Sequence, residues 1–106
     1  MELTLDTEKY EQLQKAFIAE ITQTVMVKLV EAGLEGDQLE DATASITFNV
    51  ASIIDDTTRI DADGIEVRPY LTFREGDNEL VHCGENSYTY DLMMGVMKKL
   101  FHAKEG

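Results

Sequence analysis

The sequence of 106 residues has little cysteine, few basic residues and no long apolar run. Its one cysteine, Cys83, excludes an internal disulfide. No segment reaches the roughly 20 consecutive apolar residues that span a bilayer, and the acidic, amphipathic N-terminus is unlike a signal peptide. Nine basic residues against 21 acidic ones give a net charge of −12, which disfavours direct binding of nucleic acid phosphates. We therefore expect a cytoplasmic protein that binds neither nucleic acid nor membranes.

The composition is that of one small folded domain. Hydrophobic residues make up 43% and charged residues 28% of the chain, so we expect it to fold rather than remain disordered. A chain of this length has room for one hydrophobic core. Residues 1–106 are therefore predicted to form a single domain.

The negative charge is concentrated in the middle of the chain. Residues 35–64 contain eight acidic residues and only Arg59, a net charge of −7, whereas residues 86–106 have a net charge of +1. The predicted acidic patch consists of four aspartates: Asp55, Asp56, Asp61 and Asp63. A solvated, self-repelling region that aids solubility explains this charge most simply. The functional alternative is a surface for a basic partner, with weak calcium binding by the same aspartates as a further alternative.

Two segments have the apolar periodicity of helices. Residues 6–33 carry one apolar stripe, with Asp6 or Thr7 as the capping residue at the start and Gly33 at the end. Residues 87–103 form the second predicted helix, capped by Ser87 or Thr89. Apolar side chains of this second helix cover about 160° of the helical wheel, more than the roughly 100° that one contact face needs. The excess indicates either burial between two neighbours or a surface for a partner.

Three further segments alternate between apolar and polar side chains, which is typical of half-buried strands: residues 44–50, 65–74 and 79–84. The predicted order is helix, strand, strand, strand, helix. We therefore predict the α+β class, as a two-layer α-β-β-β-α domain. In this arrangement a three-stranded antiparallel meander carries two helices on one face.

The turns between these strands predict their register. Asp63-Gly64 favours a two-residue hairpin turn, which pairs Ile60 with Val67 and, further from the turn, Ile54 with Phe73. The next turn, with the sequence GDN, pairs Phe73 with Val81. The apolar faces of strands and helices together predict the core: Phe17, Ile21, Phe48, Val67, Leu71, Phe73, Met97 and Leu100.

The residue pairs that resemble catalytic or metal sites do not support such chemistry. His82 and Cys83 are neighbours in a predicted strand, so their side chains point to opposite faces and do not form a nucleophile-base pair. The sequence contains no phosphate-binding loop and no nucleophile elbow. We therefore expect no enzyme activity, no cofactor and no metal site. An enzyme of unrecognised type, with close and perturbed carboxylates, is the least favoured hypothesis.

The leading hypothesis is a small acidic, non-catalytic protein-binding domain of adaptor, chaperone-like or immunity type, which forms a homodimer. Methionine adapts to varied partner surfaces, and the outer face of the sheet has no cover from the two helices. The predicted partner-binding residues lie on these two surfaces: Tyr70, Arg74, His82, Met93, Met94 and Met97. The alternative is an acidic nucleic-acid mimic, whose carboxylates occupy the basic groove of a DNA- or RNA-binding protein.

Overall fold

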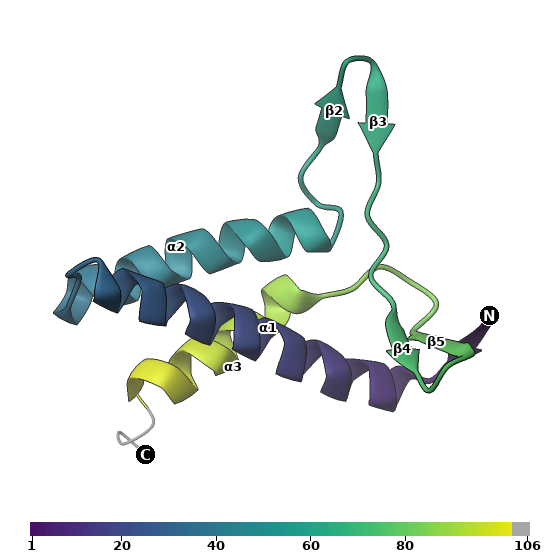
Figure 1. Cartoon of the computed structure of the whole chain (residues 1–106), viewed down its shortest axis with the longest axis horizontal. Coiled ribbons are helices and arrows are strands. Elements are labelled where there is room, and N and C mark those ends of the chain that lie inside the picture. Colours follow the sequence, from purple (N-terminus) through teal and green to yellow (C-terminus); the bar gives the residue numbers. More distant parts are fainter. Residues whose placement is uncertain (103–106) are drawn as a thin grey trace.

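The computed structural model describes residues 1–102, which form three helices and five short strands (Figure 1). In chain order these are β1 (Glu2–Leu5), α1 (Thr7–Glu31), α2 (Gly36–Ile54), β2 (Ile60–Ala62), β3 (Ile65–Val67), β4 (Phe73–Glu75), β5 (Glu79–His82) and α3 (Thr89–His102). The predicted α+β class is confirmed, whereas the predicted meander is only partly matched. No helix within residues 1–102 has the length and hydropathy of a membrane span.

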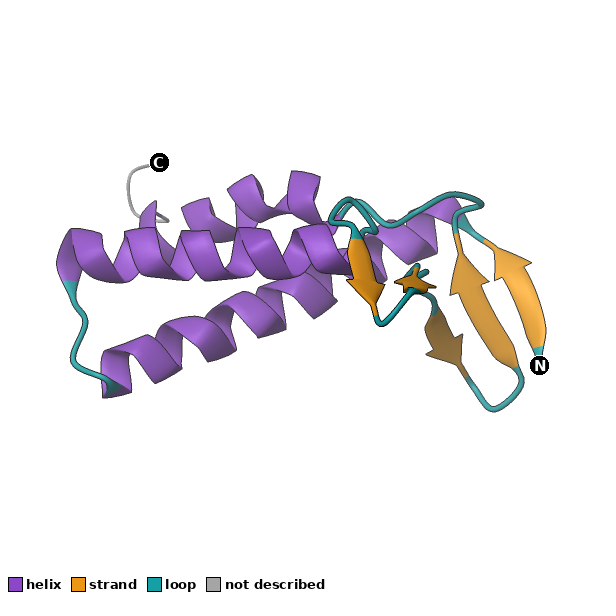
Figure 2. Cartoon of the chain, turned by 90° about the horizontal axis from the view of Figure 1, so that it is seen from above, coloured by secondary structure: helices purple, strands orange, loops and turns teal. Residues whose placement is uncertain are grey.

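The three helices pack against one another and form most of the molecule (Figures 1 and 2). α1 and α2 are joined by a short loop and run side by side, and α3 packs against both of them. The buried apolar cluster lies between these helices: Ile18, Ala51, Met93, Val96 and Met97. All the strands lie toward the end of the molecule that is opposite the α1–α2 loop (Figure 2).

Residues 44–50 lie within α2, so the prediction of a strand there is wrong. The alternating sequence also has a helical repeat, because the three buried residues Thr43, Thr47 and Ala51 recur every four positions. The Thr43 and Thr47 hydroxyls each donate a hydrogen bond of 2.7 Å to the carbonyl four residues earlier. These bonds satisfy the buried hydroxyls within the helix. α2 thus presents small buried side chains to the interior of the helical bundle.

The predicted registers are confirmed beside both turns, whereas the predicted pairing of Ile54 with Phe73 is wrong because Ile54 is the last residue of α2. Ile60 pairs with Val67 in the β2–β3 hairpin, and Phe73 pairs with Val81 in the β4–β5 hairpin. The two hairpins belong to separate sheets, however, because β2 and β3 pair only with each other in the described part of the chain. The segment between β3 and β4 contains Pro69, which has no N–H to donate to a strand ladder.

β1 was not predicted from the sequence, and it completes a three-stranded sheet of order β1-β5-β4. It runs parallel to β5, with Leu3 opposite Leu80. α1 begins immediately after β1, with the Asp6 side chain accepting a hydrogen bond from the Lys9 N–H at 3.0 Å. The sheet is therefore joined directly to the start of α1.

Tyr10 and Phe73 pack α1 against this sheet, with their ring centroids 5.5 Å apart. The Tyr10 hydroxyl donates a hydrogen bond to the Leu71 carbonyl, and burial raises the pKa of Tyr10. The core itself is more helical than predicted. Met97 is buried as expected, whereas Phe17 is 36% exposed and Val67 is 40% exposed. Because residues 44–50 form a helix rather than a strand, the core lies between helices instead of against a sheet.

Candidate interaction surfaces

The carboxylate of Asp55 fixes the start of α3. Asp55 directly follows α2 and is 3% exposed. It accepts one hydrogen bond from the Ser87 hydroxyl and one from the Thr89 hydroxyl, each of 2.7 Å. It also accepts from the backbone N–H groups of Thr89 and Tyr90, at 3.0 and 2.8 Å. A carboxylate at a helix N-terminus pairs with unsatisfied N–H groups and with the helix dipole. The sequence predicted that Ser87 or Thr89 caps this helix. In the structure both of their hydroxyls donate to Asp55, whose carboxylate caps α3 instead.

The four aspartates of the predicted acidic patch therefore do not act together. Asp55 is buried, and Asp56 forms an ion pair with Arg68 at 2.6 Å, which raises the pKa of the arginine. Asp61 lies 3.5 Å from Arg59, and Asp63 occupies the hairpin turn with a φ of 52°. Within residues 1–102, no three histidine, cysteine or acidic side chains gather closely enough to hold a metal ion.

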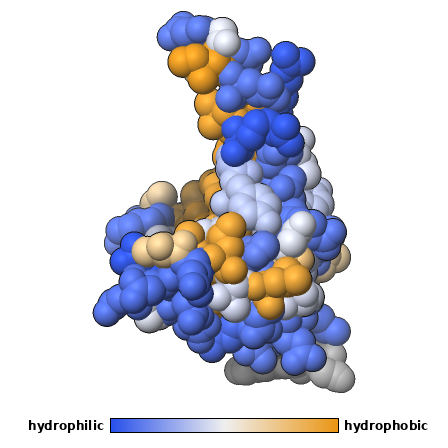
Figure 3. Space-filling view, turned by 90° about the vertical axis from the view of Figure 1, so that its right-hand side faces the viewer, coloured by the Kyte–Doolittle hydropathy of each residue, from blue (hydrophilic) through white to orange (hydrophobic). Residues whose placement is uncertain are grey.

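The β2–β3 hairpin, Ile60–Val67, projects from the rest of the molecule and is called the arm below (Figure 1). Its register places four apolar residues on one face: Ile60, Ala62, Ile65 and Val67. Ile65 is 65% exposed, and Figure 3 shows hydrophobic atoms along one side of the arm. Among residues 1–102, neither strand packs extensively against a helix or the other sheet. An isolated two-stranded hairpin is marginally stable in water, so such an apolar face suits a partner.

The predicted partner-binding residues of the sheet lie close together. The Tyr70 hydroxyl is 3.2 Å from Nδ1 of His82, and His82 is the last residue of β5, the central strand of the three-stranded sheet. Arg74 is exposed on β4 and pairs with Leu80, two residues from His82 on β5. Cys83 is half-buried, and its thiol donates to the Glu85 carbonyl at 3.3 Å. This surface is polar, in contrast to the arm.

Of the three methionines predicted to contact a partner, only Met94 is exposed. Met93 and Met97 lie in the helical core, and the Sδ atom of Met93 accepts a hydrogen bond from the Thr22 hydroxyl at 3.5 Å. Met94 is 71% exposed on the opposite side of α3. The expectation that all three form a partner surface is corrected, because α1 and α2 together cover the other two side chains.

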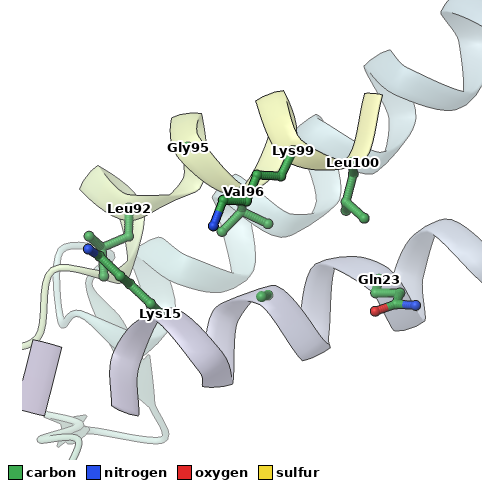
Figure 4. Close-up of a pocket in the computed structure, with 8 residues that line it drawn as sticks. Lys15, Gln23, Leu92, Gly95, Val96, Lys99 and Leu100 are labelled. Atoms are coloured by element: carbon green, nitrogen blue, oxygen red, sulfur yellow. The ribbon is translucent and has the colours of Figure 1, made fainter. Parts of the chain in front are cut away.

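α3 is bordered by two grooves, one on each side. The groove between α1 and α3 has a volume of about 370 Å³ and contains the Lys15 and Lys99 side chains (Figure 4). The groove between α2 and α3 has a volume of about 590 Å³. At its end, Nε2 of His102 lies 2.9 Å from a Glu40 carboxylate oxygen. Gly95 lines both grooves, so the surface of α3 is lowest at this residue.

Comparisons of the chain with protein-family models, with curated proteins and with solved structures give no match. The function is therefore inferred from the surfaces themselves. Sequence analysis identified the hairpin at Asp63-Gly64 but not that it stands apart from the other strands. Pro69 could have indicated this separation, because it follows β3 closely and has no N–H to continue the pairing of the strands.

Proposed function

We propose that this protein is a small, acidic, non-catalytic protein-binding domain that forms a homodimer in the cytoplasm. The arm binds a second, unidentified protein through its apolar face. The observation that carries this proposal is the exposure of Ile65 and Val67 on a projecting hairpin. Adaptor, chaperone-like and immunity-type proteins all require such a surface. The proposal includes no direct contact with nucleic acid or membranes, in keeping with the net charge of −12.

The local structure of the arm supports this role. The ion pair between Arg68 and Asp56 holds the base of the arm, and Asp63 and Gly64 adopt the positive φ angles of a tight turn. A hairpin that is ordered before binding loses less conformational entropy when it binds. Asp61 and Glu66 lie opposite each other in the strand register, on the face away from the apolar residues. Only the apolar side of the arm is therefore suited to burial.

The described contacts of the polar groups support the proposed non-catalytic role. Tyr70 and His82 form a contact between two potential acid-base groups, but they do not line either groove beside α3. The Asp55 carboxylate is buried, but all its described contacts are with donors that hold α3 in place. Both sets of contacts stabilise this fold.

The nucleic-acid mimic is the less favoured function. It requires a stripe of solvent-exposed carboxylates, formed by Glu35, Asp37, Glu40, Asp41, Asp55, Asp56, Asp61 and Asp63. Four of these already have partners within the chain: Asp55 caps α3, Asp56 pairs with Arg68, Asp61 pairs with Arg59, and Glu40 contacts His102. Carboxylates with such partners are less suited to imitate free phosphates.

The test compares two double variants of the arm. Ile65→Ser with Val67→Ser removes the apolar face, and Asp61→Asn with Glu66→Gln changes only the opposite face. Tagged proteins capture partners from native lysate, and each partner found is purified and titrated calorimetrically. We expect the first variant to weaken binding at least about tenfold, which corresponds to roughly 1.4 kcal/mol, and the second to bind as the parent does. Equal binding by both variants would show that the arm is not the binding surface.

A further inference from the structure

The outer face of α3 complements itself. Opposite its buried side, α3 exposes four residues on neighbouring turns: Asp91, Met94, Gly95 and Lys98. At about 100° of rotation per residue, Asp91 and Lys98 lie along the centre of this face. Met94 and Gly95 lie on either side of the line from Asp91 to Lys98, about halfway between them along the helix axis. The face therefore carries an acid at one end, a base at the other, and a large side chain beside a vacant position at the middle.

We infer that two copies of this chain associate through these faces, with their α3 helices antiparallel about a two-fold axis between Met94 and Gly95. In this register, Asp91 lies opposite Lys98 of the partner subunit, and Lys98 lies opposite Asp91 of the partner subunit. Met94 lies in the same layer as Gly95 of the partner subunit. The inference specifies the homodimer included in the proposed function and does not depend on the arm.

Charge favours the antiparallel arrangement. Asp91 and Lys98 are seven residues apart, two helical turns, and within residues 1–102 neither forms an ion pair. A parallel pair of α3 helices would oppose like charges, whereas the antiparallel pair forms the same ion pair twice. The dipoles of the two helices are also opposed in this arrangement.

Shape favours the same register. Met94 is 71% exposed, and a Cβ atom added at Gly95 would have no neighbouring atom within 4 Å. Glycine lowers the stability of a helix relative to alanine, and no contact within the described chain requires a glycine here. The vacant position at Gly95 allows two helices to approach closely, and the flexible Met94 side chain of the partner subunit fills the space.

The charge of the whole molecule selects α3 among the possible contact surfaces. With a net charge of −12, two copies repel each other in most orientations. Residues 86–106 have a net charge of +1, so α3 belongs to the region where this repulsion is weakest. One helix face buries less area than a standard protein interface, so we expect a weak dimer with a dissociation constant in the micromolar range.

Charge reversal tests the register directly. Asp91→Lys and Lys98→Glu each place like charges in both ion pairs, so each variant alone should dissociate at least about tenfold more readily, as measured by sedimentation equilibrium. The double variant D91K/K98E restores both pairs and should dimerise within about threefold of the parent. An equimolar mixture of the two single variants should form heterodimers by native mass spectrometry. In such a heterodimer the lysine introduced at position 91 of one copy faces the glutamate introduced at position 98 of the other.

Two further variants separate shape from net charge. Gly95→Gln should abolish association while leaving the thermal midpoint of the dilute monomer unchanged or higher, because only the partner subunit occupies that space. Lys99→Glu is the matched control: it changes the charge as Lys98→Glu does, but its position faces the groove beside α1, so we expect less than about a threefold effect.

Three outcomes would overturn the inference. The parent protein remains a single 11.9 kDa species over roughly two orders of magnitude in concentration, or its dimer survives both single charge reversals, or D91K/K98E does not restore association. A dimer that survives both reversals but is lost with the arm variant would place the second copy on the arm. Partner binding by the arm is measured in a separate experiment, so the failure of one proposal leaves the other unaffected.

Discussion

The helical body and the arm differ in where they place charge and apolar side chains. In the body, the Asp55 carboxylate is buried against the start of α3, and the apolar side of α3 faces α1 and α2. In the arm, the apolar side chains of Ile65 and Val67 are exposed, and the charged pair Arg68–Asp56 lies at the base. The body therefore uses its side chains to hold its own elements together, while the arm leaves its apolar side chains exposed.

This difference predicts how each region responds to substitution. Removing a side chain from the body exposes or orphans groups that were satisfied within the chain, so the free energy of unfolding falls. Removing an apolar side chain from the arm changes little within the chain, because few atoms of the body contact it. The arm keeps its shape through its turn and the ion pair at its base. Substitutions in the two regions should therefore separate stability from binding.

The largest effect is expected at Asp55. Asp55→Ala leaves two hydroxyls and two N–H groups at the start of α3 without their acceptor, and we expect the free energy of unfolding to fall by about 3–5 kcal/mol. Urea denaturation measures this loss. Asp63→Asn is the control, because asparagine also tolerates a positive φ, and it should change stability by less than about 0.5 kcal/mol. Equal losses for both variants would show that Asp55 does not anchor α3.

Two neighbouring methionines provide a comparison within one helix. Met93→Ala opens a cavity between three helices and should lower the free energy of unfolding by about 2–5 kcal/mol. Met94→Ala should change the stability of the dilute monomer by less than about 0.5 kcal/mol, because its side chain is exposed. Thermal melts at low concentration distinguish the two. A large loss for Met94→Ala under these conditions would mean that α3 is rotated relative to the structure.

The parts of the fold that could be predicted from the sequence are those set by neighbouring residues. The register of both hairpins follows from short turns that fix which residues face each other, and Asp6 marks the start of α1 locally. Residues 44–50 could not be assigned correctly by alternation alone, because their threonines and alanines satisfy both a strand and a helical repeat. The buried threonine hydroxyls are satisfied by α2 itself, which composition does not show.

The candidate surfaces were harder to predict because they depend on distant contacts. Asp55 and its donors are 32 to 35 residues apart, so a run of aspartates gave no indication that one is buried. Met93 and Met97 were predicted at a surface because the helix was expected to face one sheet, whereas it contacts two helices. Met94 and the Tyr70–His82 contact lie at positions that the sequence did indicate.

A smaller effect is expected from the ionisation of Tyr10. Its pKa is raised by burial above the ordinary value of 10.0, so the folded state holds the phenolic proton more tightly than the unfolded state. The resulting stabilisation is complete below about pH 10 and is lost as the pH rises toward the pKa of the folded state. Denaturation at about pH 9 and about pH 11 should show this loss. Tyr10→Phe should reduce the loss, and an unchanged pH dependence would assign it to other groups.

A small change in stability is expected from the arm. Ile65→Ser with Val67→Ser removes two apolar side chains that are 65% and 40% exposed and that pack mainly within the arm, so the free energy of unfolding should change by less than about 1 kcal/mol. Arg68→Ala is the companion variant, because it removes the ion pair at the base and should speed amide hydrogen exchange in the arm while leaving the helices unaffected. Hydrogen exchange measured by mass spectrometry resolves the two regions. If the serine variant instead destabilises the helices, the arm and the body fold as one unit, and the proposed division between them is wrong.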